Sequence, residues 1–271
     1  MRVLLPPRPP APPARFDDPR WAAAVALIVL LAAGVAQAQA VAAGQPGVVE
    51  TILKWTPLIG TGFALNVAIS AIAMAAGTLL GLGLGLCQIS LLPPVRAGSW
   101  LLTQFFRNAP WLVLLFWCIC VLPVRVTVFG ATVDIPNWLR ATIGLTLPVM
   151  ANVSEIVRGA VRSLPGGQWE AAESLGFNRG QTLRMVILPQ CLKRMTPPWM
   201  NLYAIVVMST PLASIVGVEE AMALTRGALN AERRGDLLIP MYGALLLAFF
   251  AYCWPIARAT RWLEHRARVR A

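Results

Sequence analysis

Six apolar stretches, each close to or beyond the length that a helix needs to cross a membrane, dominate this chain. They cover residues 21–43, 58–90, 99–122, 138–160, 198–218 and 237–257. A crossing helix needs about 20 mostly apolar residues, and within the hydrocarbon core only helices and closed barrels satisfy their backbone polar groups. The charged fraction of 13% points the same way, since soluble domains have about 25%. The sequence therefore predicts an all-α, polytopic membrane protein of about six transmembrane helices.

The two ends of the chain differ from the rest. Residues 1–20 are rich in proline and arginine, a composition that builds no core, and we expect a disordered tail. The run 21–43 includes AQAQA, which resembles a signal-peptidase site, so a cleaved signal is an alternative to a retained helix. The length of the run favours the retained helix. Residues 264–271 form a basic tail.

Two of the predicted spans contain helix-modifying residues. The stretch 58–90 is too long for one straight crossing and includes Gly77, Gly81, Gly83 and Gly85, which indicates close helix packing or a bend. In the span 198–218, Pro211 removes a backbone donor and permits a break.

The positive charge is unevenly distributed. The net charge is +11, and most of the 23 lysine and arginine residues fall in the two tails, in 91–98 and in 158–197. Because cytoplasmic segments carry this excess, we expect both termini and the segment 163–197 to lie in the cytoplasm. Topology and lipid headgroups then account for the charge, and no nucleic-acid partner is expected.

Residues suited to metal binding or catalysis are sparse. His265 is the only histidine, and the five cysteines lie in or beside apolar stretches. A zinc site needs several such ligands together, and a serine-protease triad needs a histidine. We expect buried reduced thiols, no metal site and no catalytic residue.

The segment 168–189, QWEAAESLGFNRGQTLRMVILP, is polar and lies between two apolar spans. Gly176 is placed for a left-handed cap after a first short helix, and Asn178 with Gln181 forms a capping-box pattern for a second. We expect Pro189 to stop that second helix. These arguments alone leave two hypotheses open, a solvated hairpin that only connects two spans and an element that docks a partner.

The spacing of this segment resembles the EAA loop of permease subunits of ABC importers. EAA is followed by three residues, a glycine, nine residues, and then an apolar residue, any residue and Leu-Pro. The matching positions are Glu170, Ala171, Ala172, Gly176, Val186, Leu188 and Pro189. Val186 stands where isoleucine is usual and keeps a β-branched apolar shape. In that family the loop is a coupling helix that fits a groove on the cytoplasmic ATPase.

The resemblance covers about residues 57–263, with the loop at 163–197. SEIVRGAVRSLPGGQWEAA is similar to permeases for polar amino acids, and FRNAPWLVLLFW looks like their F-R-G-T-P-L-L-V-Q element. Asn108, Ala109, Leu114, Met208 and Pro211 depart from the subgroup's patterns. These departures affect the substrate assignment more than the transporter assignment.

The resemblance implies a five-helix permease core with one additional N-terminal helix, in a bacterial inner membrane. The implied function is the path for a polar amino acid or similar small solute. The implied partners are an ATPase, a second permease in a homo- or heterodimer, and an extracytoplasmic binding protein. The chain has no G-x-x-x-x-G-K-[ST] loop, so the ATP and Mg²⁺ would be used by the ATPase and this chain would bind no cofactor.

Two other function classes compete with this one. An ion-coupled transporter or channel would need intramembrane carboxylates, and Glu155 is the only acidic residue well inside a predicted span. A membrane enzyme lacks a nucleophile, base or metal constellation.

Polar residues within the spans are the candidates for the translocation path or gate. Glu155 and Arg158 are three apart on one helix face, so they form either a structural ion pair or part of the path. Serine and threonine often bond helix backbone instead. The full candidate set is Arg107, Asn152, Glu155, Arg158, Asn201, Ser209 and Thr210.

Overall fold

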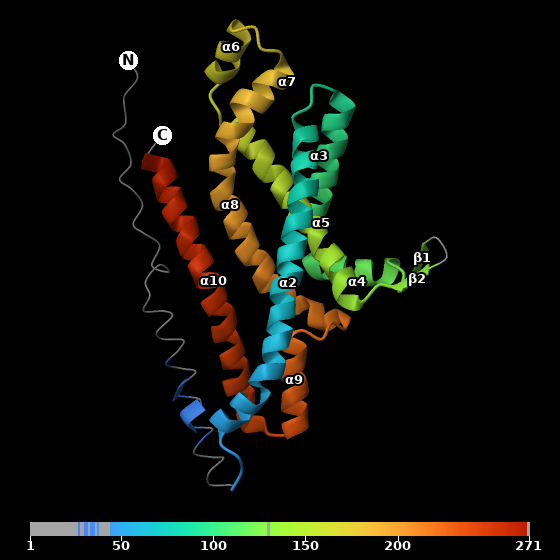
Figure 1. The fold of residues 1–271 in the computed structure, drawn as a ribbon, viewed down its shortest axis with the longest axis vertical. Helices are drawn as coiled ribbons and strands as arrows, with labels where there is room; N and C mark the ends of the chain where they lie inside the picture. The colour runs from blue at the N-terminus through green and yellow to red at the C-terminus, as the bar shows by residue number, and fades with distance from the viewer. Residues whose placement is uncertain are drawn as a thin grey trace, which may run out of the picture.

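The computed structural model describes residues 44–128 and 131–269, with positions 27, 30–31, 33–35 and 37. The predicted tail 1–20 and most of the predicted helix 21–43 lie outside these residues. Figure 1 shows a bundle of long helices. The α-helices are α2 (Val48–Gln88), α3 (Pro93–Asn108), α4 (Trp111–Val121), α5 (Asn137–Arg162), α6 (Gly167–Ser174), α7 (Arg179–Gln181), α8 (Leu188–Ser209), α9 (Ala221–Glu232) and α10 (Leu238–Val269). A π-helical turn covers Thr182–Ile187, and 3-10 segments cover Thr210–Val216 and Gly235–Leu237.

Three helical stretches within the described residues are long and apolar enough to cross a membrane, namely Val48–Gln88, Arg179–Val216 and Gly235–Glu264. A fourth results if α3 and α4 count as one span. The predicted all-α membrane fold is confirmed. The last helix continues to Val269, so the predicted basic tail is largely helical.

The predicted span 99–122 is sharply bent in the structure. α3 and α4 meet at Ala109 and Pro110 with a bend of 104°. Pro110 has no N–H, and its ring pushes the residue before it out of the helical region; Ala109 accordingly has an extended ψ of 136°. At Pro211, where the sequence predicts a break, the chain tightens into the 3-10 segment Thr210–Val216 and remains part of one helical stretch, Arg179–Val216.

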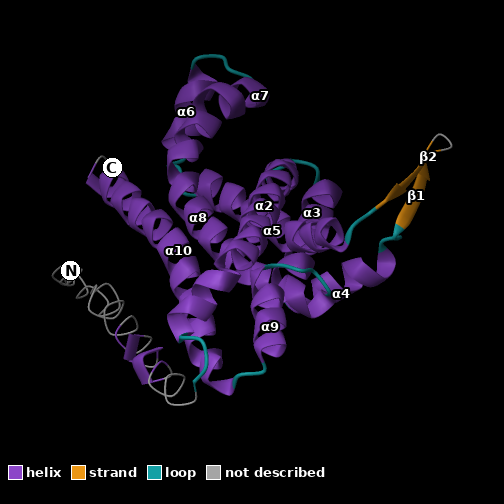
Figure 2. Cartoon of the chain, turned by 60° about the horizontal axis from the view of Figure 1, so that its bottom comes forward, coloured by secondary structure: helices purple, strands orange, loops and turns teal. Residues whose placement is uncertain are grey.

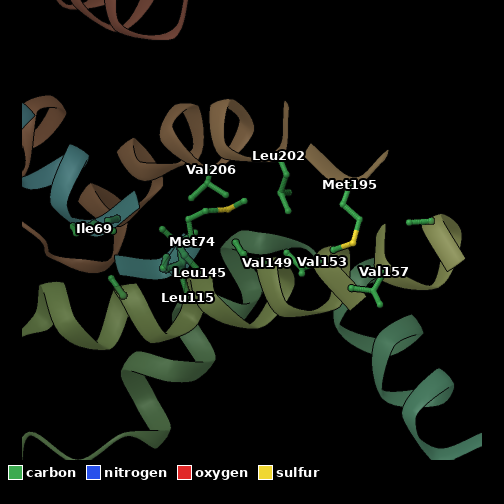
Figure 3. Close-up of a cluster of buried hydrophobic side chains, with 14 of the residues drawn as sticks. Ile69, Met74, Leu115, Leu145, Val149, Val153, Val157, Met195, Leu202 and Val206 are labelled. Carbon is green, nitrogen blue, oxygen red and sulfur yellow. The ribbon is translucent and has the colours of Figure 1, made fainter. Parts of the chain in front are cut away.

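Helix α5 forms the centre of the bundle and contacts α2, α3, α4 and α8. Figure 3 shows its buried valines, Val149, Val153 and Val157, along one side of the helix. Their spacing of four residues repeats each turn, which produces a continuous apolar face. Met74 of α2 and Val206 of α8 extend the same core.

Helix α2 packs closely on α5 through glycines for which the sequence predicted close packing or a bend. Gly77, Gly81 and Gly85 leave no space for a β-carbon, whereas Gly83 faces open space. Of the two alternatives that the sequence left open, close packing is therefore confirmed for these three positions. α2 is a single helix from Val48, ten residues before the predicted start of the span at Leu58.

A two-stranded hairpin, to which the sequence analysis assigned no element, projects from the bundle (Figure 2). Strand β1 (Arg125–Val128) pairs antiparallel with β2 (Ala131–Asp134). Its open end is closed by an ion pair between Arg125 and Asp134, at 2.8 Å.

Candidate coupling segment and translocation path

The turn between α6 and α7 has the predicted local geometry. Gly176 has a φ of +79°, and the Phe177 N–H donates to the Ala172 carbonyl at 3.1 Å, as in a Schellman cap. The capping box is also present, because Gln181 N donates to Asn178 Oδ1 and Asn178 N donates to Gln181 Oε1, both at 2.9 Å. Two short helices therefore meet at Gly176 as expected.

The predicted stop at Pro189 is wrong. The chain runs from α7 through the π-helical turn Thr182–Ile187 into α8, and Pro189 lies in the first turn of α8. Proline has no N–H to donate, and the π-helical turn directly before Pro189 is the kind of local adjustment that allows a proline inside a continuous helix. The polar segment is thereby joined to a membrane-crossing helix without a flexible linker.

The segment α6–α7 stands at one end of the bundle (Figure 1). Glu170, Ala171 and Gly176 are exposed, while Ala172 is only 3% exposed and packs inside the segment. The Arg179 guanidinium lies 5.4 Å from the centre of the Trp169 ring, which braces the two helices against each other. A small, rigid and exposed surface results.

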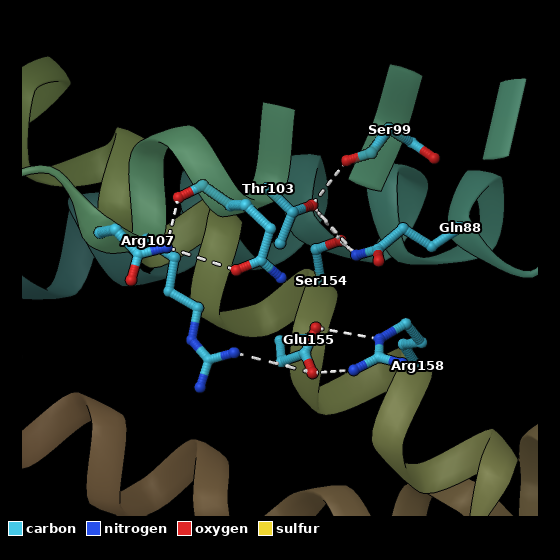
Figure 4. A network of polar contacts seen from close by, with 9 residues as sticks. Gln88, Ser99, Thr103, Arg107, Ser154, Glu155 and Arg158 are labelled. Atoms are coloured by element: carbon cyan, nitrogen blue, oxygen red, sulfur yellow. Dashed lines mark hydrogen bonds and ion pairs between the residues drawn. The ribbon is translucent and has the colours of Figure 1, made fainter. Parts of the chain in front are cut away.

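A charged cluster lies between α3 and α5 (Figure 4). The predicted pair is present: Arg158 donates to Glu155 from Nε at 3.0 Å and also from Nη2. Arg107, in the last turn of α3, brings its Nη1 to 3.7 Å from the same carboxylate. Two arginines thus share one carboxylate, and the cluster has a net positive charge.

Glu155 also faces a cavity of about 330 Å³ between α5 and α8. Arg194 and Ser163 line it as well, and Arg194 Nη1 donates to the Ser163 carbonyl at 2.9 Å. The cavity wall therefore carries one acid and one base from different helices.

Residues 77–269 match the family described as binding-protein-dependent transport system inner membrane component. The chain belongs to this family. It is the membrane-spanning permease subunit of an ABC importer in the inner membrane, and a separate ATPase subunit hydrolyses the ATP. Membership removes the alternatives of an ion-coupled transporter and of an enzyme.

Relatives and solved structures agree with this assignment. YckA of Bacillus subtilis, a probable amino-acid ABC transporter permease protein, is 34% identical over 73% of this chain and 83% of that protein. YhdY of Escherichia coli, an inner membrane amino-acid ABC transporter permease protein, is 31% identical over 76% of this chain and 55% of its own length. The permease thus spans little more than half of YhdY. A crystal structure of an amino acid ABC transporter with histidines has a TM-score of 0.68 at 24% identity, covering 79% of this chain and 96% of that chain, so the fold is shared.

Two other candidate path residues of the permease, Asn152 and Ser209, bond to the backbone of their own helices. Asn152 Nδ2 donates to the Pro148 carbonyl and Ser209 Oγ donates to the Ile205 carbonyl, each at 2.8 Å. Asn201 is exposed on α8. In the part of the chain that the structure describes, Asn201, Ser209 and Thr210 form no hydrogen bond or ion pair with Arg107, Glu155 or Arg158, and these last three form the cluster.

A neutral network beside the cluster was missed by the sequence analysis. Gln88 Nε2 donates to Thr103 Oγ1 at 3.0 Å and to Ser154 Oγ at 2.7 Å, all three being buried (Figure 4). The network joins α2, α3 and α5 next to Glu155. The only sequence signal was the presence of polar residues at span positions.

A buried carboxylate was also missed. Glu220 is fully buried, caps α9 through the N–H groups of Met222 and Ala223, and accepts from Asn66 Nδ2 at 2.8 Å. Asn66 in turn accepts from Ala221 N at 3.1 Å and donates to Thr210 Oγ1 at 2.8 Å. In this permease, one group of hydrogen bonds thus links α2, the 3-10 segment and α9.

Proposed function

We propose that this permease forms the translocation path for a polar amino acid or a similar small zwitterion. The observation that carries the proposal is the placement of the Glu155 carboxylate, beside Arg107 and Arg158, on the wall of the cavity between α5 and α8. A carboxylate and guanidinium groups in one place complement the ammonium and carboxylate groups of an amino acid. The names of the relatives YckA and YhdY support the same substrate class.

Arg107 is placed to bind a solute. Its side chain is 43% exposed and lies 3.7 Å from Glu155, which is beyond hydrogen-bond distance, whereas Arg158 is held by two hydrogen bonds to that carboxylate. Arg107 can therefore bind a carboxylate of the solute while Arg158 keeps Glu155 in place.

The exposed part of the EAA segment is the proposed contact with the ATPase. Glu170, Ala171 and Gly176 form its surface, while Ala172 packs inside the segment and Leu188 and Pro189 begin α8. The continuous helix from α7 into α8 would carry a displacement of α6 into the membrane. ATP and Mg²⁺ would be used by the ATPase, with no cofactor bound to this chain.

The proposed assembly has two permease subunits, identical or related, and an extracytoplasmic binding protein. The core would comprise residues 57–263, with 21–43 as an additional helix. Both termini would lie in the cytoplasm, which is supported by the placement of lysine and arginine and by the position of the α10 C-terminus at the same end of the bundle as α6 (Figure 1).

Co-purification with the neighbouring ATPase, together with uptake of labelled amino acids, tests the coupling. We expect Glu170→Arg and Gly176→Asp to lower both the recovered ATPase and the uptake. Glu173→Arg is the matched control, since Glu173 is exposed on the same helix but outside the EAA motif. Survival of complex and uptake in both motif variants would contradict the coupling role, and failure to take up any labelled amino acid would contradict the substrate class.

A further inference from the structure

A second cavity lies beside α9. Helix α9 stands at the opposite end of the bundle from α6 and α7 (Figure 1). The volume of the cavity is about 380 Å³, within the range of about 300 to 1,000 Å³ that is usual for small-molecule sites. Its wall combines the N-terminal part of α2, the end of the 3-10 segment and one face of α9. The residues that matter here are Trp55, Glu219, Arg226 and Gly227.

The cavity wall carries one acid and one base. Glu219 lies two residues before α9 begins at Ala221, and Arg226 lies in the second turn of this helix. Among the residues that the structure describes, neither side chain takes part in an ion pair. Both are exposed, so both charges are available to a solute.

Two ion pairs lie near the cavity. Lys54 pairs with Glu232 at 2.7 Å, and Arg234 pairs with Asp236 at 2.5 Å. None of these four residues lines the cavity, whereas Glu219 and Arg226 do, and Arg226 also interacts electrostatically with the buried carboxylate of Glu220.

The wall is also rigidly built. The start of α9 is held by the buried cap Glu220 and by close packing against Gly62, where a β-carbon would lie 2.6 Å from Ala221 N. Trp55 is fixed by a hydrogen bond from Nε1 to Glu232 at 2.8 Å. A preformed wall lowers the entropic cost of binding, because fewer side chains must be ordered.

We propose that this cavity is an extracytoplasmic entrance site for the zwitterionic solute, where Arg226 binds its carboxylate and Glu219 its ammonium group. The site is separate from the Glu155 cluster and precedes it on the way into the membrane. The proposal rests on the proposed function for the solute class and for the side of the membrane.

Protection of an introduced thiol tests the site directly. The permease–ATPase complex, in lipid nanodiscs without binding protein, carries Gly227→Cys, with Cys87 and Cys120 replaced by serine. A β-carbon at Gly227 meets no atom within 4 Å, so this cysteine fits without displacing neighbours. Gly235→Cys is the matched control, because Gly235 has the same free space and lies outside the cavity. A thiol-specific maleimide is the reagent, and L-glutamine, L-glutamate and L-arginine are the probes.

We expect the amino acid that is taken up to slow labelling at Gly227→Cys and not at Gly235→Cys. Its α-amide and its N-acetyl derivative, which each lack one charge, should protect less. Adding Arg226→Gln should raise the half-protecting concentration about tenfold, as for the loss of one charge-assisted hydrogen bond. Arg233→Gln, an exposed residue outside the cavity, should leave it unchanged.

Two results would overturn the entrance site. The first is full-rate labelling in the presence of amino acids while the parent complex, supplied with binding protein and ATP, takes them up; the proposed function would then stand without this site. The second is unchanged protection in Arg226→Gln together with weaker capture of the binding protein, which would make this a protein-docking surface. Absence of uptake by the parent together with absence of protection at Gly227→Cys would overturn the substrate class as well.

Discussion

Gly81 of α2 lies so close to Val153 of α5 that no side chain fits between them. A β-carbon on Gly81 would stand 2.6 Å from Val153 Cβ and 2.6 Å from the Met150 carbonyl oxygen. Gly77 and Gly85, one turn to either side, contact Val149 and Val157 in the same way. Helices in lipid associate by such close packing, because burial of apolar surface gives no advantage there.

Gly81→Ala is therefore expected to destabilise the permease by about 1 to 3 kcal/mol, since the β-carbon forces α2 and α5 apart. Thermal unfolding of the detergent-purified complex measures this. Gly83→Ala is the control, because Gly83 lies on the same helix with nothing within 4 Å; it should unfold at or slightly above the parent temperature, given alanine's higher helix propensity. Equal effects of the two variants would show that packing at Gly81 is not limiting.

Local features of this fold were readable from the sequence, and contacts across the chain were not. The cap at Gly176 and the capping box of Asn178 and Gln181 depend on neighbours within a few residues, so their chemistry identifies them. Pro189 shows a limit of such rules, because proline marks either a helix end or a first turn. The sequence supported the end, whereas the structure has the first turn.

The polar contacts illustrate the other limit. Asn66 and Glu220 are 154 residues apart, and nothing in either local sequence indicates their hydrogen bond. Glu155 with Arg158 was predicted from helical spacing, but the approach of Arg107 depends on how α3 packs on α5. The candidate site was thus identified by residue type, and its geometry required the tertiary structure.

The hydrogen bond between Asn66 and Glu220 predicts that a substitution that keeps the shape of Asn66 but removes its polar atoms strongly lowers stability. Asn66→Leu removes the Nδ2 donor from a fully buried carboxylate and leaves Ala221 N without its acceptor. We expect a loss of about 3 kcal/mol or more in stability, as for a buried charge that loses a partner. Pairing it with Glu220→Gln should recover part of the unfolding temperature, because the remaining group is then neutral. A double variant as unstable as Asn66→Leu would contradict this account.

Gly176 provides a test of backbone conformation alone. Its φ of +79° is unfavourable for other residues, and no atom lies within 4 Å of a β-carbon placed there. Gly176→Ala should weaken the cap by about 1 to 2 kcal/mol and lower the amount of ATPase that co-purifies. Gly176→Asn should be milder, since asparagine tolerates this region. Gly167→Ala, which has open space and no positive φ, should behave as the parent.

The pair formed by Lys54 and Glu232 predicts a pH dependence. Hydrogen bonds from Lys54 Nζ and Trp55 Nε1 hold the pKa of Glu232 below its usual range. The contribution to stability is therefore complete above the unfolded pKa of about 4.3 and is lost as the pH falls through the lower folded value.

Glu232→Gln should lower the unfolding temperature at pH 7, by an amount corresponding to about 1 kcal/mol or less. The difference from the parent should shrink as the pH is lowered below about 4.3. Glu50→Gln, an exposed carboxylate at the start of α2, is the control and should show no such trend. A difference that stays constant down to pH 4 would mean that Glu232 acts through packing and not through its charge.

The two roles open to Glu155, structural ion pair and part of the path, make different predictions for neutralised variants. If the carboxylate only offsets the charge of Arg158, Glu155→Gln destabilises the permease, and the double variant with Arg158→Gln restores both stability and uptake. If the carboxylate contacts the solute, the double variant restores stability and leaves uptake low.

The position of Glu155 on the cavity wall favours the second result. We expect uptake to fall about tenfold in both variants, as for the loss of one charge-assisted hydrogen bond, with the ATPase still bound. Uptake in proteoliposomes and unfolding temperature, measured on the same preparations, separate the two roles, and full recovery of uptake in the double variant would assign Glu155 to structure alone.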